Sequence, residues 1–459
     1  MRILTELEQF DPALLQKYNR PLPRYTSYPS VSQLTTEFSE LDFRSAIAAS
    51  NYRKTPLSLY VHIPFCQSAC YYCNCHVIVS PDHRIAIPYL EYLVQEIQQT
   101  AALIDRKRPV TQMHWGGGTP NYLTLEQVKL LWQTIEQQFT LDPAAEVSIE
   151  IHPRYVDRNY IQALRAIGFN RISFGLQDFD PQVQAAVNRI QSATMLNNVM
   201  NWAKAANFTS VNVDLMYGLP YQTLSSFRDT IQKTIALDPD RIAIFNFAYV
   251  PWLKPVQRQL DPATLPSPTK KLAMLQMTIA ELAQHQYQSI GTEYFAKSSD
   301  DLALAHQHRS LTQNLQGYTT QLNTELLGFG LTAISLLEDT YSQNHTQLGD
   351  YYQAIDTGCS PVSQGIKLSR ADLLRRDVIM QLMSHGYLIK SEFADCYGII
   401  FDTYFAPELE ALKALEMDSL VKLLADSIEV TSVGHLFART IASVFDSHTP
   451  AHGQLSMVI

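Results

Sequence analysis

The sequence predicts an α/β fold: a partial, TIM-like (β/α)6 barrel with an N-terminal arm and a smaller, mainly helical C-terminal domain. Two observations carry this prediction. From Leu57 onward, apolar β-rich runs alternate with helical patterns about every 30–40 residues, which is typical of βα units around a parallel sheet. Beyond about Gly358 the pattern changes to helices without strong strands. We therefore expect domains at residues 1–55, 56–357 and 358–459.

The arm, residues 1–55, has no clear period and carries the segment RPLPRYTSYPS, which starts at Arg20. Arg20, Arg24 and Tyr28 suit an anionic ligand, because guanidinium groups bind carboxylates and a phenol adds a hydrogen bond. The alternative is that this segment only docks on the main domain. The N-terminus, MRILTELEQF, lacks the apolar core of a secretory signal.

The barrel prediction rests on strands and helices that follow one another in series. The expected strands are Leu57–His62, Val110–Trp115, Glu146–Ile151, Arg171–Leu176, Ser210–Tyr217 and Arg241–Val250. The expected helices between them are Tyr89–Ile104, Leu125–Phe139, Arg158–Ile167, Thr194–Ala206 and Ser225–Ala236. In such barrels the chemistry lies at the C-terminal ends of the strands.

After the barrel strands we expect a helix at Thr269–His285, a last strand at Ser289–Phe295 and a buried strand or helix at Leu326–Leu337. The end domain is expected to hold elements at Asp372–Leu382, from Leu409 onward, at Ser427–Val430 and at Gly434–Phe445. This end domain resembles a winged helix. Because it is not notably basic, we expect a packing module or lid and no DNA binding.

Composition excludes several classes of function. Hydrophobic residues make up 46% of the chain and charged residues 17%, against about 25% in typical soluble chains. The formal net charge of −9 disfavours a nucleic-acid partner. No stretch reaches the roughly 18 apolar residues of a membrane span. We expect a cytoplasmic protein, in which clustered cysteines indicate metal or redox chemistry.

The loop after the first strand carries Cys66, Cys70, Cys73 and Cys75, four of the six cysteines of the chain. Three thiolates on one loop can hold three corners of a cubane iron–sulfur cluster and leave the fourth iron open. A closed site with Cys75 as the fourth ligand is the competing interpretation. A four-cysteine zinc site usually draws on two separated CxxC pairs, and this chain has no second pair.

Polar or glycine residues follow successive strands. Consecutive glycines expose backbone groups to a ligand, and one polar side chain per strand end is how a barrel builds a cofactor site. Singly, each residue is as well explained as a structural hydrogen-bonding group. Together they favour a nucleotide-like ligand, while His62 fits either a core or a site position. The residues are Gly116, Gly117, Gly118, Thr119, Glu150, Gln177, Arg189 and Asp214.

The motifs YVHIPFCxxxCxYCxC, HWGGGTP, SFGLQDF, VNRIQ, DLMYGLP, QGYTT and LLGFGLTAIS occur in order. With RYTSYP in the arm, they resemble the oxygen-independent coproporphyrinogen III oxidases of the radical S-adenosylmethionine superfamily. The resemblance covers the chain from about Tyr18 to its end.

The resemblance implies a [4Fe–4S] cluster on Cys66, Cys70 and Cys73, with Cys75 outside the ligand set. S-adenosylmethionine would bind the fourth iron, and a second S-adenosylmethionine would lie beside the first. The positions that match the first S-adenosylmethionine site are Tyr60, Gly117, Glu150 and Ile334. The positions that match the second site are Tyr72, Gly118, Thr119, Gln177, Arg189, Asp214 and Ala248.

The activity implied is the oxidative decarboxylation of two propionates of coproporphyrinogen III to vinyl groups in haem biosynthesis, which gives protoporphyrinogen IX. A reduced cluster would cleave S-adenosylmethionine to a 5′-deoxyadenosyl radical, which removes a β-hydrogen from the propionate. The implied partners are the substrate and an unidentified electron donor and acceptor, and we expect a monomer. Because the substrate has four carboxylates, the arginine and tyrosine side chains of the arm are candidates to bind them. The candidate catalytic or substrate residues are His62, Cys75, Arg20, Arg24, Tyr28 and Gln316.

The sequence departs from the family pattern at His76, at His152, where we expect Asp, and at Leu315, where we expect Phe. These departures leave open a paralogue with changed specificity. The rival functions are a haem-trafficking paralogue and a radical methyltransferase on the same scaffold. Trafficking paralogues generally lack the fourth cysteine, the arm motif and the long C-terminal domain, and this chain has all of them.

Overall fold

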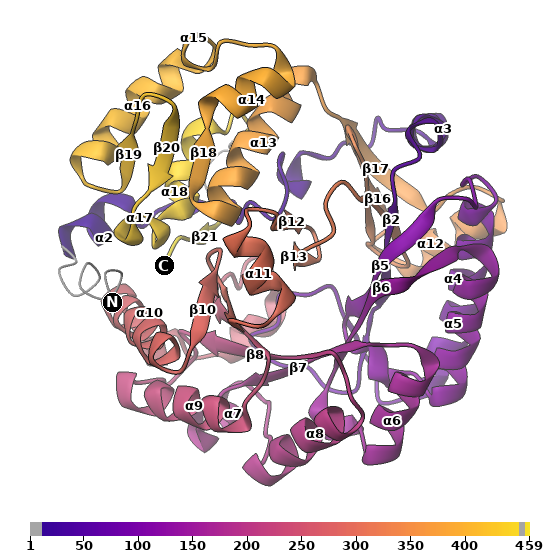
Figure 1. Cartoon of the computed structure of the whole chain (residues 1–459). Helices are drawn as coiled ribbons and strands as arrows, with labels where there is room; N and C mark the ends of the chain where they lie inside the picture. The colour runs from indigo at the N-terminus through magenta and orange to yellow at the C-terminus, as the bar shows by residue number, and fades with distance from the viewer. Residues whose placement is uncertain (1–11, 449–454) are drawn as a thin grey trace.

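The computed structural model describes residues 12–448 and 455–459. Within them, one sheet of 12 strands runs in the order β10-β11-β9-β8-β7-β6-β5-β2-β14-β15-β16-β17. Figure 1 shows its strands curving around a central space, with helices on the outside and the C-terminal domain (yellow) at one side. The predicted α/β class and partial barrel are confirmed.

The centre of the sheet is parallel and alternates with helices. Its strands are β2 (Leu57–Ile63), β5 (Pro109–Gly117), β6 (Thr140–Ile151), β7 (Arg171–Gln177), β8 (Ser210–Tyr217) and β9 (Arg241–Asn246). The covering helices are α4 (Ala86–Ala101), α5 (Leu125–Gln138), α6 (Arg158–Ile167), α8 (Ala193–Ala205), α9 (Leu224–Leu237) and α10 (Pro268–Gln284). Local signals fix their ends: Asp157 caps α6, which stops at Gly168.

Both sides of this region continue into further strands. On one side β14 (Glu325–Phe329) pairs parallel with β2, and the antiparallel strands β15 (Ile334–Leu337), β16 (Thr340–Asn344) and β17 (Val362–Lys367) follow it. On the other side lie β11 (Tyr294–Lys297) and β10 (Tyr287–Ile290). The predicted single strand Ser289–Phe295 is wrong, because the chain reverses at Gly291, whose φ is 57°. The segment Leu326–Leu337 is likewise a pair of strands that turns through Gly330.

The C-terminal domain has its own core. Its helices are α13 (Arg370–His385), α14 (Lys390–Tyr397), α15 (Phe401–Tyr404), α16 (Ala406–Met417), α17 (Ser432–His435) and α18 (Ala438–Ala442). Its small antiparallel sheet has the order β18 (Tyr387–Ile389), β20 (Ser427–Val430) and β19 (Val421–Leu423). The large sheet runs on to Lys367 in β17, past residue 358, where the sequence places the domain boundary.

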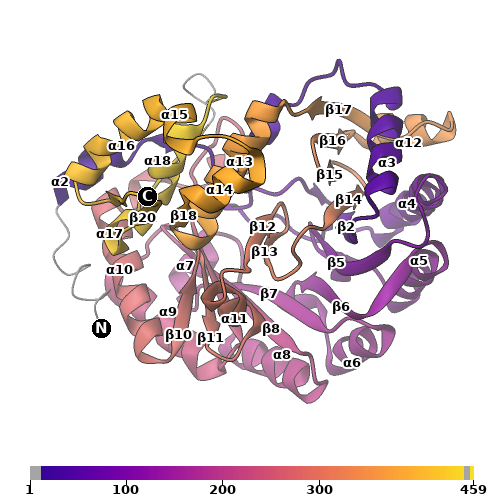
Figure 2. The same ribbon diagram turned by 45° about the horizontal axis from the view of Figure 1, so that its top comes forward.

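The arm joins the two cores. Helix α2 (Pro12–Tyr18) lies against the C-terminal domain in both views, and β1 (Pro21–Leu22) pairs with β21 (Ser456–Met457) (Figures 1 and 2). Helix α3 (Glu40–Arg53) instead packs on the barrel through Phe43. The first 11 residues of the predicted arm lie outside the described residues.

Shorter elements complete the fold. They are α7 (Pro181–Ala186), α11 (Asp301–Gln307), α12 (Leu348–Asp356), β3 (Phe65–Cys66), β4 (Ile78–Val79), β12 (Thr312–Asn314) and β13 (Gly317–Thr319). Figure 2 shows α11, β12 and β13 between the barrel and the C-terminal domain. Among the described helices, none combines the length and apolar character that a membrane crossing requires.

Candidate functional site

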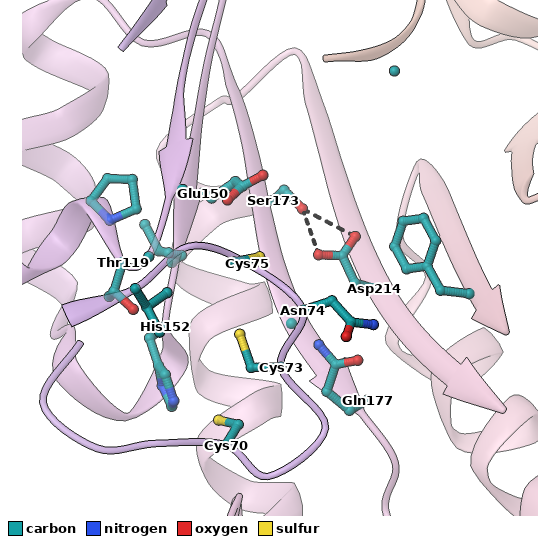
Figure 3. A pocket seen from close by; sticks show the side chains of 18 of the residues that line it. Cys70, Cys73, Asn74, Cys75, Thr119, Glu150, His152, Ser173, Gln177 and Asp214 are labelled. Carbon is teal, nitrogen blue, oxygen red and sulfur yellow. Dashed lines mark hydrogen bonds between the residues drawn. The ribbon is translucent and has the colours of Figure 1, made fainter. Parts of the chain in front are cut away.

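A cavity of about 750 Å³ opens at the C-terminal ends of the barrel strands and reaches into the barrel. The cysteine loop and the polar strand ends line it together (Figure 3). The predicted site residues on its wall are Arg24, Cys66, Cys70, Tyr72, Cys73, Cys75, Gly117, Gly118, Thr119, Glu150, Gln177, Arg189, Asp214 and Gln316. The structure therefore brings most of the predicted site into one place.

Hydrogen bonds hold the cysteine loop against β5 and the segment after β7. The sulfur of Cys66 lies 3.3 Å from the hydroxyl of Thr119, and Arg189 donates to the sulfur of Cys70 over 3.4 Å. Asn188 donates its amide to the carbonyl of Ala69 over 2.7 Å. The loop is thus fixed from two sides, which keeps its sulfurs directed at the cavity.

The sulfurs differ in their acidity. A hydrogen bond with Cys75 lowers the pKa of Cys73 to about 7, and the same bond raises the pKa of Cys75. Burial raises the pKa of Cys66 to about 11. Thiolates are the metal-binding form of cysteine, so the lowered pKa of Cys73 favours it as a metal ligand.

The donor set on this loop fits an iron–sulfur cluster. Cys66, Cys70 and Cys73 are partly exposed soft ligands on the cavity wall, and cysteine thiolates are the usual ligands of such clusters. Among the described residues, no group of at least three His, Cys, Asp or Glu side chains is placed to hold one metal ion. In a cubane each thiolate binds a different iron, so the ligands need not converge on one point.

The glycines at the end of β5 are required by close packing. A Cβ atom at Gly117, whose φ is 109°, would lie 2.5 Å from the ring of His62. At Gly118 it would lie 2.7 Å from the backbone of Pro64. Both contacts are shorter than side chains tolerate, so only glycine lets β5 approach β2 and the cysteine loop here.

His62 contacts the cysteine loop through the backbone of His76. Burial lowers its pKa to about 4, so the ring is neutral near pH 7. Its Nδ1 lies 3.1 Å from the hydroxyl of Tyr60, and its Nε2 lies 3.2 Å from the carbonyl oxygen of His76. Neither Tyr60 nor His62 lines the cavity, although the Tyr60 ring stacks on His114, which does.

The strand ends present carboxylates and amides. Glu150 lies 3.2 Å from Nε2 of His114 and keeps 44% of its side chain exposed. Ser173 donates to the carboxylate of Asp214, and partial burial, followed by the charge of Glu150, raises the pKa of Asp214 to about 6 (Figure 3). Gln177 is 9% exposed, has a φ of 70°, and its side-chain oxygen has no partner.

Several predicted site residues lie away from the cavity wall. Tyr28 is fully buried in the C-terminal core, and its hydroxyl lies 2.9 Å from that of Ser447. Arg20 donates to Ser443 and does not line this cavity. Ala248 and Ile334 also stand outside the wall, although the carbonyl of Ala248 accepts from Gln257, which reaches the cysteine loop.

Two of the departures from the family pattern, His76 and His152, line the cavity, and of these His152 is buried. Its Nδ1 accepts from the backbone of Arg154, so the proton lies on Nε2, which has no partner. Burial, and then the charge of Arg189, lowers its pKa and keeps the ring neutral. Leu315 lines a different cavity, beside the C-terminal domain.

Ion pairs at the other end of the barrel were not predicted. Arg171 at the start of β7 pairs with Asp301 over 2.7 Å and with Glu146 over 3.4 Å. Arg241 at the start of β9 pairs with Asp300 over 2.9 Å. The pairs with Asp300 and Asp301 fasten the start of α11 to β7 and β9. They join residues 130 and 59 positions apart in sequence, so no local pattern could indicate them.

Comparison with known proteins agrees with this site. Residues 60–234 match the model of the radical SAM superfamily. A relative from Synechocystis is 53% identical over 444 residues, covering 96% of this chain and 95% of its own, and one from Escherichia coli is 44% identical over 439 residues. Both are named oxygen-independent coproporphyrinogen III oxidase.

A solved structure extends the agreement to the whole fold. Coproporphyrinogen III oxidase from Escherichia coli, described as a radical SAM enzyme, superposes with a TM-score of 0.91 and 43% identity. The superposition covers 96% of this chain and 99% of that one. The chain therefore belongs to the family of oxygen-independent coproporphyrinogen III oxidases.

Proposed function

We propose that this protein oxidatively decarboxylates two propionates of coproporphyrinogen III to vinyl groups without oxygen and so forms protoporphyrinogen IX. The observation that carries the proposal is the single cavity that holds both the cysteine loop and the polar strand ends. The relatives named for this reaction match this chain over nearly its whole length. We place the protein in the cytoplasm and expect it to be a monomer. Analytical sedimentation would check its oligomeric state.

One [4Fe–4S] cluster on Cys66, Cys70 and Cys73 is the cofactor, with S-adenosylmethionine on the remaining iron. When bound and reduced, the cluster would supply the one-electron chemistry that generates a 5′-deoxyadenosyl radical and methionine from S-adenosylmethionine. The chain supplies orientation, exclusion of water and electrostatics. Neutral His62 and the glycines fix the loop, and Arg189 brings a buried positive charge beside Cys70.

The strand ends are suited to the nucleoside and amino-acid parts of S-adenosylmethionine. Carboxylates such as those of Glu150 and Asp214 can accept hydrogen bonds from ribose hydroxyls. The side-chain oxygen of Gln177, which has no partner, is free to accept one as well. For the first molecule we assign Tyr60, Gly117, Glu150 and Ile334. For a second molecule we assign Tyr72, Gly118, Thr119, Gln177, Arg189, Asp214 and Ala248.

Turnover under strictly anaerobic conditions tests the function. The reconstituted protein receives coproporphyrinogen III, S-adenosylmethionine and a reductant, and CO2 and protoporphyrinogen IX are quantified. We expect two CO2 per porphyrinogen consumed. Formation of 5′-deoxyadenosine without a vinyl product would instead favour a trafficking paralogue, and a methylated product would favour a methyltransferase.

A serine variant of Cys75 tests the ligand assignment. Because the cluster is assigned to Cys66, Cys70 and Cys73, Cys75→Ser should keep the iron content and visible absorbance of the wild type. Cys73→Ser, the matched control, should lose both. Loss of iron in Cys75→Ser would make Cys75 a cluster ligand.

A further inference from the structure

His152, which follows β6 directly, is held in one position on the cavity wall. Its backbone N–H donates to the side-chain oxygen of Asn121 over 2.7 Å, and its carbonyl accepts from the amide of the same residue over 3.2 Å. The ring lies against that of Tyr155, with 4.7 Å between the two centroids. Because backbone and ring are both fixed, the fold sets the direction in which each ring nitrogen points.

The ring presents one N–H group that no described residue accepts. His152 is 6% exposed, and its Nδ1 accepts from the backbone of Arg154 over 3.3 Å, which leaves the proton on Nε2. Within the described residues Nε2 has no partner, although the atom is buried. A buried N–H without an acceptor is unfavourable, and this ring lines the cavity. The acceptor therefore belongs to what occupies the cavity.

Sulfur atoms of the cysteine loop lie on the same part of the wall. In the view of Figure 3, the His152 ring extends from beside Thr119 toward Cys70. The hydroxyl of Thr119 lies 3.3 Å from the sulfur of Cys66, and Arg189 donates to the sulfur of Cys70 over 3.4 Å. The charge of Arg189 also reaches the His152 ring, where it helps to lower the pKa. This part of the wall thus places hydrogen-bond donors around the sulfurs.

We propose that Nε2–H of His152 donates a hydrogen bond to a sulfur of the [4Fe–4S] cluster and so raises the reduction potential of the cluster. This rests on the proposed function, which assigns the cluster to Cys66, Cys70 and Cys73. Reduction adds negative charge to the cluster, and a donor at a sulfur stabilises that charge. The aspartate that the family pattern predicts at this position would add negative charge and act in the opposite direction. His152 therefore makes the cluster of this chain easier to reduce.

A redox titration of the cluster, followed by EPR in the absence of S-adenosylmethionine and substrate, tests the proposal. His152→Leu removes the N–H, so its midpoint potential should be about 59 mV more negative, which is a tenfold change in the equilibrium constant for one electron. His152→Gln, whose amide places an N–H near the same point, should stay within about twofold of wild type in that constant. His152→Asp should be at least as negative as His152→Leu.

His83→Leu is the matched control. His83 lies beside the same loop, but both of its ring nitrogens have partners, the carbonyl of Tyr122 at 2.9 Å and the side chain of Gln67 at 2.7 Å. The potential of this variant should equal that of the wild type.

A second measurement uses the wild-type protein and does not depend on how well a variant folds. Histidine labelled with 15N should give a weak nitrogen coupling in the pulsed EPR spectrum of the reduced cluster. His152→Gln, in which the cluster keeps its donor but the ring is gone, should lose this coupling.

Three results would overturn the proposal: an unchanged potential in His152→Leu, equal shifts in His152→Leu and His152→Gln, or no histidine coupling in the wild type. An unchanged potential together with weaker S-adenosylmethionine binding by His152→Leu would assign the N–H to that cofactor instead. Because the potential is measured without substrate, failure to form vinyl product would refute the oxidase activity and not the hydrogen bond. A wild-type protein that takes up no cluster on reconstitution would refute both.

Discussion

Glu96 is a buried carboxylate of α4 whose removal should change how stability depends on pH. It is 2% exposed and accepts hydrogen bonds from the backbone of Gly330 over 2.7 Å and from Asn344 and Tyr351 over 2.6 Å each. These bonds tie α4 to the turn between β14 and β15, to the end of β16 and to α12. Burial nevertheless outweighs them and raises the pKa of Glu96 to about 7 from 4.5.

The sign follows from this raised pKa. Between about pH 5 and pH 8 the folded protein keeps the Glu96 proton longer than the unfolded chain does, so stability falls as pH rises. A shift of this size corresponds to a loss of about 2 to 3 kcal/mol across that window. In Glu96→Gln the group cannot titrate, so this part of the pH dependence disappears.

Urea unfolding at a series of pH values measures the effect. The wild type should lose about 2 to 3 kcal/mol relative to Glu96→Gln between about pH 5 and pH 8. Glu91→Gln, an exposed change on the same helix, should run parallel to the wild type. A constant difference between wild type and Glu96→Gln across this range would refute the reasoning.

Two further substitutions test packing and pairing. In Gly117→Ala the new methyl group lies against the ring of His62, and the resulting strain is about 1–3 kcal/mol. Binding of S-adenosylmethionine, measured by equilibrium dialysis, should therefore weaken about tenfold. Unchanged binding would contradict the claim that only glycine fits at this position. Glu325→Ala leaves Arg108 buried and unpaired, which should lower the unfolding free energy by about 3–5 kcal/mol. Lys413→Ala removes only an exposed pair with Glu410 and should cost under about 1 kcal/mol, so equal losses would contradict this expectation.

Local patterns were sufficient for elements whose own sequence encodes their ends. Strand β8 and helix α6 have the predicted bounds, because alternation marks the strand and the Asp157 cap and Gly168 frame the helix. The hairpin at Gly291 was missed, since an apolar run with one glycine is compatible with a continuous strand. The motif residues converged on one cavity because parallel strands end at the same face.

Tertiary contacts decided the rest. Tyr28 was a candidate ligand residue, yet the C-terminal core buries it, and most of that core comes from residues more than 340 positions later. Glu96 resembles any acid on an amphipathic helix until the turn after β14, the end of β16 and α12 supply its donors. Such pairings across the chain leave no local signal.

Hydrogen transfer from the substrate to the nucleoside tests the central claim most directly. Coproporphyrinogen III deuterated at the β-positions of its propionates is turned over with reductant, and 5′-deoxyadenosine is examined by mass spectrometry. The account predicts deuterium in the 5′-deoxyadenosine, together with vinyl product and CO2. Vinyl product accompanied by unlabelled 5′-deoxyadenosine would contradict it, because the radical would then not take its hydrogen from the propionate.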